Sequence, residues 1–279
     1  MPTAMNTLNA KSRSMNPSEG GVAFSATAGS RGSGISLIIP AYNEEDVIEQ
    51  TLVQLPAGIF SKVIVADNAS SDRTAEIARR AGATVVSAPL RGYGYACLAA
   101  LEICTDDEIL VFLQADGSEP AAESLALIEP IAHGEADLVI GSRVLGEREG
   151  RVAPGALRSH QVFGNWLATT LLRWFWGFPY TDLGPFRAIR AGALRMLALR
   201  EGRYGWTVEM QMRALDCGLR VREIPVGYGL RQAGEEKVSG NWRASLLAGY
   251  TILRVVLAGG IRRLLRQEIR LGGGKRDGS

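Results

Sequence analysis

The amino-acid sequence predicts an α/β fold in which a mostly parallel central sheet is flanked by helices. Between residues 34 and 142, short runs rich in Val, Ile and Leu alternate with segments whose apolar residues recur at helical spacing. This alternation is typical of parallel sheets that are covered by helices on both faces. Hydrophobic residues make up 46% of the chain and charged residues 22%, which is enough apolar material for a large buried core.

The first half of the chain contains five predicted strands, each a short apolar or β-branched run. They cover residues 35–41, 62–67, 84–89, 108–115 and 136–142. Helices are expected where apolar residues gather on one face between these strands. They cover residues 44–55, 72–81, 93–104 and 121–132.

The second half has a different pattern, beginning with an aromatic and apolar segment over residues 161–180. The pattern then predicts a turn and strand over 181–190, a helix over 204–217 and a strand over 221–230. A long amphipathic C-terminal helix is expected over 241–268, with its arginines on one broad side. These arginines are Arg243, Arg254, Arg262 and Arg266.

The chain divides into three predicted parts. Residues 1–33 are rich in Ser, Gly, Asn and Ala and predict a disordered tail without the apolar core of a signal peptide. Residues 34–240 form the predicted α/β domain. Residues 241–279 are expected to supply an interfacial or oligomerisation helix and a polar tail. The most apolar segment, 244–261, contains an arginine, so no transmembrane helix is expected.

Charge and cysteine content narrow the possible functions. The formal net charge of +2 is close to neutral, which argues against general nucleic-acid binding. The three cysteines are an odd number without metal-site spacing, so we expect a reducing, cytoplasmic compartment.

The run ILVFLQADGSEP, residues 109–120, places Asp116 at the carboxyl end of a predicted buried strand. Ligands of parallel α/β sheets bind at this edge, and a carboxylate there can hold a divalent cation against phosphates. Polar side chains also follow the other strands, among them Glu44, Asp67 and Arg143. The sequence therefore predicts one site at the carboxyl edge of the sheet.

Four motifs in order carry a family resemblance: PAYNE from Pro40, DNASSDRT from Asp67, QADGS from Gln114 and GSR from Gly141. Together they resemble the family 2 inverting glycosyltransferases, which have the Rossmann-like GT-A fold. Later motifs are similar to the branch that contains dolichol-phosphate mannose synthase and polyprenyl-phosphate glucosyltransferases. These motifs are TDLGPFRAIR, YGWTVEMQ and VREIPVGYGLRQAGEEKVSG.

The resemblance implies a UDP- or GDP-linked sugar donor. The residues it implies for donor binding are Pro40, Ala41, Tyr42, Glu44, Asp67, Gln114, Ala115, Asp116, Arg231 and Lys237. Asp116, with Ser118 beside it, would hold Mg²⁺ or Mn²⁺ on the diphosphate. Gln114 stands where the family usually has an aspartate, so weaker metal binding is expected, and Gln114→Asp is expected to tighten it.

The resemblance also implies a dolichyl- or undecaprenyl-type polyprenyl phosphate as the acceptor of a hexose. The residues expected to face it are Arg143, Arg158, Ser159 and Asp182. The predicted catalytic residues are Asp116, Arg143, Arg158 and Glu209. An acceptor phosphate is already an anion and needs no base.

Two alternatives remain open at this stage. If the acceptor is instead a hydroxyl of a lipid or small molecule, Glu209 is the candidate base. Because Gln114 replaces an acid, the chain could also be a catalytically weakened protein that binds nucleotide sugars.

Two segments are expected to meet a membrane. Residues 161–180 contain Trp166, Trp174 and Trp176, and tryptophan favours the membrane interface. The basic amphipathic C-terminal helix also fits an interfacial position. We therefore expect peripheral attachment at the inner face of the membrane, directly or through a membrane partner subunit. A core or dimer helix is the alternative, with a homo-oligomer as its consequence.

Overall fold

The structure is a computed structural model that describes residues 34–104, 108–231 and 242–273, with side chains described as far as Arg266 and not for residues 242–246. Its centre is a seven-stranded sheet with the order β3-β2-β1-β4-β6-β5-β7. The strands are β1 (Ile35–Ala41), β2 (Lys62–Asp67), β3 (Thr84–Ser87), β4 (Ile109–Phe112), β5 (Leu138–Ser142), β6 (Arg187–Arg190) and β7 (Val221–Pro225). All the predicted strands are confirmed.

In this sheet, β6 runs antiparallel to both of its neighbours, β4 and β5, and every other adjacent pair is parallel. The predicted mostly parallel sheet is therefore correct. The strand β4 ends at Phe112, three residues before the predicted end at Ala115. It ends there because the backbone N–H of Gln114 turns to the Glu119 side chain, 2.9 Å away, instead of a strand partner.

The sheet separates two hydrophobic cores. Leu37 and Ile39 of β1 face one core, and Ile38 between them faces the other, as expected for side chains that alternate along a strand. The first core contains the helices α1 (Ile48–Val53), α2 (Thr74–Arg80) and α4 (Ser124–Ala132). The second contains α3 (Tyr93–Leu101), α6 (Ser159–Trp176), α7 (Ala191–Leu197), α8 (Trp206–Asp216) and α9 (Trp242–Gly273).

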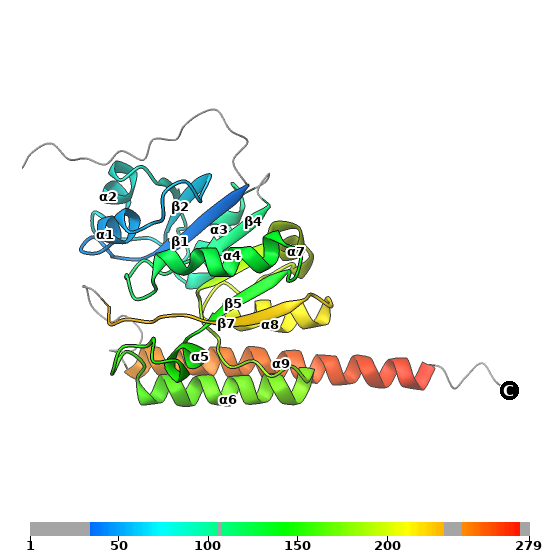
Figure 1. The fold of residues 1–279 in the computed structure, drawn as a ribbon. Helices are drawn as coiled ribbons and strands as arrows, with labels where there is room; N and C mark the ends of the chain where they lie inside the picture. Colours follow the sequence, from blue (N-terminus) through cyan, green and yellow to red (C-terminus); the bar gives the residue numbers. More distant parts are fainter. Residues whose placement is uncertain (1–33, 105–107, 232–241, 274–279) are drawn as a thin grey trace, which may run out of the picture.

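The aromatic segment 161–180 forms most of α6, which lies beside α9 at one edge of the molecule (Figure 1). The two helices approach closely at Gly260, where an added Cβ would lie 2.4 Å from the Phe175 ring. The predicted C-terminal helix is confirmed. No helix in the described ranges has both the length and the apolar character that crossing a bilayer requires.

Candidate active site

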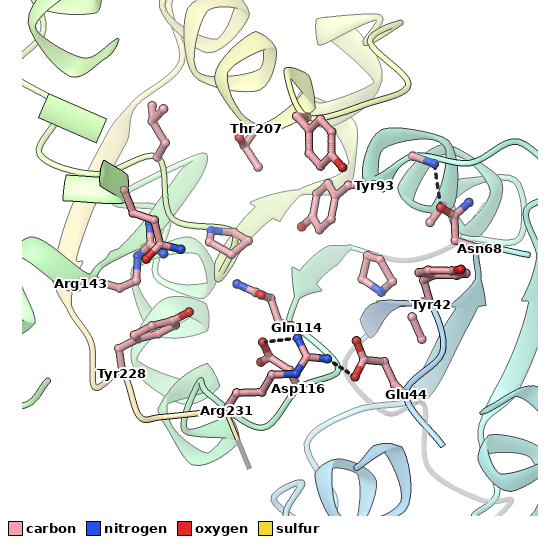
Figure 2. Close-up of a pocket in the computed structure, with 18 of the residues that line it drawn as sticks. Tyr42, Glu44, Asn68, Tyr93, Gln114, Asp116, Arg143, Thr207, Tyr228 and Arg231 are labelled. Carbon is pink, nitrogen blue, oxygen red and sulfur yellow. Dashed lines mark hydrogen bonds and ion pairs between the residues drawn. The ribbon is translucent and has the colours of Figure 1, made fainter. Parts of the chain in front are cut away.

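A pocket of about 800 Å³ opens at the carboxyl edge of the sheet, where the sequence predicted a site (Figure 2). It brings together residues from the ends of β1 and β4 and from the loops that follow β5 and β7. The predicted site residues among its lining are Pro40, Ala41, Tyr42, Glu44, Gln114, Asp116, Arg143, Arg158 and Arg231. Lys237 lies outside the described residues.

Arg231 bridges two carboxylates in the lower part of the pocket in Figure 2. Its guanidinium is hydrogen bonded to Glu44 and lies 3.5 Å from Asp116 Oδ2. All three side chains are largely buried. Among the described residues, two carboxylates thus lie against one arginine, so a donor diphosphate that enters here would compete with both for Arg231.

Asp116 is the carboxylate best placed for a metal. Its Oδ1 accepts hydrogen bonds from the backbone N–H and the hydroxyl of Ser118, at 3.1 and 2.6 Å. The described residues contain no group of three or more His, Cys, Asp or Glu side chains that could hold an ion. Asp116 lines the pocket and Ser118 does not, so an ion held here would depend on substrate phosphates for most of its ligands, as is usual for Mg²⁺.

Gln114 is hydrogen bonded to a buried acid, Glu119, and the sequence did not predict this contact. Its backbone N–H donates to Glu119 Oε2 at 2.9 Å, and its Nε2 donates to Oε1 at 3.3 Å. Glu119 is 4% exposed, and this burial raises the pKa of its carboxyl to about 8. Position 114 has no acid, but the carboxyl of Glu119 lies directly behind it, outside the pocket lining.

The Tyr42 end of the pocket contains two residues that the sequence analysis missed, Asn68 and Arg91. The Arg91 guanidinium lies 3.6 Å from the centre of the Tyr42 ring. Asn68 fixes the Arg91 loop, because it donates to the carbonyl of Leu90 at 2.7 Å and accepts from the N–H of Gly92 at 2.7 Å. Asn68 follows β2 and Arg91 follows β3, and both strands end at this edge of the sheet. The strand-end rule, applied to β3, would therefore have predicted Arg91.

Asp67 does not line the pocket. Its Oδ1 accepts a hydrogen bond from the N–H of Ser70, at 3.3 Å, within the turn that follows β2. Ala115 also faces away, since it is buried in the core and its carbonyl accepts from the Thr51 hydroxyl. Of the two adjacent pairs 67–68 and 114–115, the pocket lining thus contains Asn68 and Gln114.

Arg143 lies at the opposite end of the pocket from Tyr42 and is fixed by Asp182. Its Nε and Nη2 donate to the two carboxylate oxygens of Asp182, each at 2.8 Å, and its backbone N–H donates to Oδ2 at 2.8 Å. Asp182 is 1% exposed. It therefore orients Arg143 and lies outside the lining of this pocket, and the acceptor contact expected of it stays a prediction.

The structure does not bring Glu209 or Ser159 into the pocket lining. Glu209 accepts hydrogen bonds from the backbone N–H groups of Arg200 and Glu201, at 3.0 and 2.7 Å, and from Arg213 at 2.9 Å. These bonds hold the loop before α8. Glu209 therefore braces this loop, and its role as a general base stays a prediction.

Comparison with known proteins agrees with this geometry. The model of the family described as "Glycosyl transferase family 2" matches residues 36–196, more than half of the chain. The chain belongs to glycosyl transferase family 2. It is 36% identical over 225 residues to an uncharacterized glycosyltransferase of Mycobacterium tuberculosis, covering 81% of this chain and 99% of that protein. The chain is therefore a glycosyltransferase.

One further relative and one structural neighbour are similar to this glycosyltransferase. An undecaprenyl-phosphate mannosyltransferase of Micrococcus luteus is 32% identical, over 73% of this chain and 86% of that protein. The crystal structure of glucosyl-3-phosphoglycerate synthase from Mycobacterium tuberculosis, in complex with Mn²⁺, UDP and glucosyl-3-phosphoglycerate, superimposes with a TM-score of 0.65. It covers 88% of this chain and 86% of that chain at 22% identity, which confirms the predicted GT-A fold.

Proposed function

We propose that this family 2 glycosyltransferase transfers a hexose from a UDP- or GDP-linked donor to a polyprenyl phosphate, with inversion at the anomeric carbon. The observation that carries the proposal is the chemistry of the lining. Among the described residues that line the pocket, the carboxylates are Glu44 and Asp116, both paired with Arg231, and there is no histidine. A neutral hydroxyl acceptor would need a base, whereas a phosphate would not.

The acceptor would bind at the end of the pocket where Arg143 and Arg158 lie. Arg143 Nε and Nη2 are held by Asp182, while its Nη1 makes no hydrogen bond to the described residues. The buried ion pair fixes the guanidinium, so Nη1 is oriented before the anion arrives. Charge-assisted bonds from a pre-oriented arginine suit a phosphate oxygen.

The donor would occupy the rest of the pocket, with its nucleoside near Tyr42 and Asn68 and its diphosphate near Asp116 and Arg231. A phosphate oxygen of the acceptor attacks the anomeric carbon, and the bond to the donor's diphosphate breaks with its electron pair on the leaving oxygen. No proton has to be removed. A bound Mg²⁺ or Mn²⁺, held by Asp116 with Ser118 beside it, would neutralise charge on the leaving group. Arg231 supplies further positive charge there.

The surface supports contact with a membrane. Phe163, Trp166 and Trp174 on α6 are 57–76% exposed. The neighbouring helix α9 exposes further apolar side chains, which include Leu247, Tyr250, Leu257 and Ile261. Exposed aromatic and aliphatic side chains on adjacent helices suit the interface of a bilayer, where a polyprenyl acceptor lies. We therefore propose peripheral attachment through α6 and α9.

The name of one relative, an undecaprenyl-phosphate mannosyltransferase, supports this acceptor class. The complexes of the structural neighbour with Mn²⁺ and UDP support a divalent ion with the donor. The direct test is incubation of the protein with undecaprenyl phosphate, Mn²⁺ and radiolabelled UDP-glucose or GDP-mannose. We expect an acid-labile glycolipid from one of the two donors.

Variants make this test specific. Arg143→Met should lower the rate of sugar transfer at least about 100-fold, because the acceptor phosphate and the Asp182 carboxylate both lose the guanidinium that pairs with them. Arg195→Met, which removes an exposed arginine of α7 outside the pocket lining, is the matched control and should be as active as the wild type. Donor binding without turnover of any phosphate acceptor would contradict the proposed function and favour a binding protein.

A further inference from the structure

A second pocket, of about 440 Å³, lies on the other side of the Arg143–Asp182 ion pair. It is formed between α5 (Arg143–Arg148), one side of α6 from Gln161 to Arg173, and the segment 179–182. The two pockets share Arg143 and Gln161 in their linings. The second pocket therefore begins at the residue that would hold the acceptor phosphate in the first.

The lining of the second pocket is amphipathic. Its apolar part consists of Val144, Leu157, Val162, Trp166, Pro179 and Tyr180. Arg148 and Arg173 add positive charge to that of Arg143, and their side chains make no ion pair with the described residues. The acids here are Glu147 and Asp182, and Asp182 is already paired with Arg143. The apolar side chains suit an apolar chain that continues from an anionic group held at Arg143.

The second pocket also reaches the exposed aromatic surface of α6. Trp166, which lines it, is 57% exposed, and its ring lies 5.8 Å from that of Phe163, which is 61% exposed. An apolar chain that leaves the pocket past Trp166 would therefore stay in contact with apolar side chains. Free phosphate or a small polar acceptor would gain nothing from this wall.

We propose that the second pocket binds the apolar chain of the acceptor next to its phosphate, so that the acceptor lies across Arg143 with its phosphate in the first pocket. This inference rests on the proposed function, which it extends by giving the acceptor an amphiphilic site on the protein itself. The ion pair of Arg143 and Asp182 then separates the reacting phosphate from the chain. Two alternatives are outcomes of the test. The chain could bind nonspecifically to the exposed face of α6, or it could bind to no part of the protein.

The test compares the binding of two phosphate monoesters by calorimetry in the presence of Mn²⁺ and UDP or GDP. Farnesyl phosphate carries an apolar chain and ethyl phosphate carries almost none. The wild type should bind farnesyl phosphate at least about tenfold more tightly, because each buried methylene contributes to affinity. Equal affinity for the two esters would overturn the proposal.

Two tryptophan substitutions on α6 locate the binding. Thr170 is exposed and lines the second pocket, so Thr170→Trp should fill it and remove the tenfold preference while leaving ethyl phosphate binding unchanged. Gly164 is exposed on the same helix, lines neither pocket and has open space around it, so Gly164→Trp should keep the preference. A preference that survives Thr170→Trp, or that Gly164→Trp abolishes, would place the chain elsewhere on α6.

This experiment is separate from the test of the proposed function. Turnover of undecaprenyl phosphate decides whether the protein is a polyprenyl-phosphate transferase. The affinity ratio of the two esters, and its loss in Thr170→Trp, decides whether the second pocket holds the chain. A wild type that transfers sugar but shows no such ratio would retain the proposed function and refute the second pocket.

Discussion

Replacing Glu119 by glutamine should remove a fall in stability that the wild type shows as pH rises. Glu119 is 4% exposed, and burial, as the largest cause, raises the pKa of its carboxyl from 4.5 to about 8. The backbone N–H of Gln114, which donates to it at 2.9 Å, opposes this rise only in part. In the unfolded chain the carboxyl would titrate near its ordinary pKa.

The sign and size of the effect follow from these two pKa values. Between pH 4.5 and 8 the folded protein keeps a proton that the unfolded chain has released. The free energy of unfolding therefore falls as pH rises, by up to about 1.36 kcal/mol per pH unit between the two pKa values. The fall is about 3 kcal/mol from pH 4.5 to 7 and about 4 kcal/mol from pH 4.5 to 8. Glutamine at this position has no proton to lose, and its carbonyl oxygen can still accept from the N–H of Gln114.

The assay is urea unfolding of the wild type and Glu119→Gln from pH 5 to 9. We expect the variant to lose the decline that the wild type shows between about pH 6 and 8. Glu223→Gln is the matched control. Burial raises the pKa of Glu223 only to about 6, so this substitution should change the pH dependence of the unfolding free energy only up to about that pH. Parallel profiles for the wild type and Glu119→Gln between pH 5 and 8 would refute the reasoning.

Three further predictions concern the pocket. Asp182→Ala should lower the free energy of unfolding by about 3–5 kcal/mol in urea, because it leaves Arg143 largely buried without its counter-ion; a loss below about 1 kcal/mol would contradict this. The contacts of Gln114 with Glu119 change the expectation for Gln114→Asp, because the single variant puts a second carboxyl against Glu119. Tighter Mn²⁺ binding with UDP or GDP, measured by electron paramagnetic resonance, is now expected only when Gln114→Asp is combined with Glu119→Gln; equal tightening in both would count against this. Glu209→Gln should lower kcat less than about tenfold, whereas loss of a general base costs 100-fold or more.

The sequence by itself determined the architecture and the place of the site. Alternating apolar runs predicted the strands correctly because a parallel sheet buried on both faces requires apolar residues along each strand. The strand-end rule placed Tyr42, Glu44, Asp116 and Arg143 at one edge, and the structure brings all four into one pocket. Neighbouring strands in parallel register leave little freedom for where their carboxyl ends meet.

Only the tertiary structure decided which polar residue of each motif faces the pocket. Asp67 turns into its own loop while Asn68, next to it, lines the pocket, and no local pattern separates the two. In the sequence, Glu209 is a candidate base and Asp182 a candidate acceptor contact. The fold places backbone N–H groups against Glu209 and the Arg143 guanidinium against Asp182.

The motif around Asp116 shows the same division. Its sequence predicted Asp116 as a metal ligand and showed the substitution at Gln114, but not the contact of Gln114 with the buried Glu119. Side-chain roles of this kind depend on which donors lie within about 3 Å in space, and contacts between distant segments set that distance. A one-dimensional pattern fixes periodicity and order along the chain, whereas pairing across the fold is settled only when the elements pack.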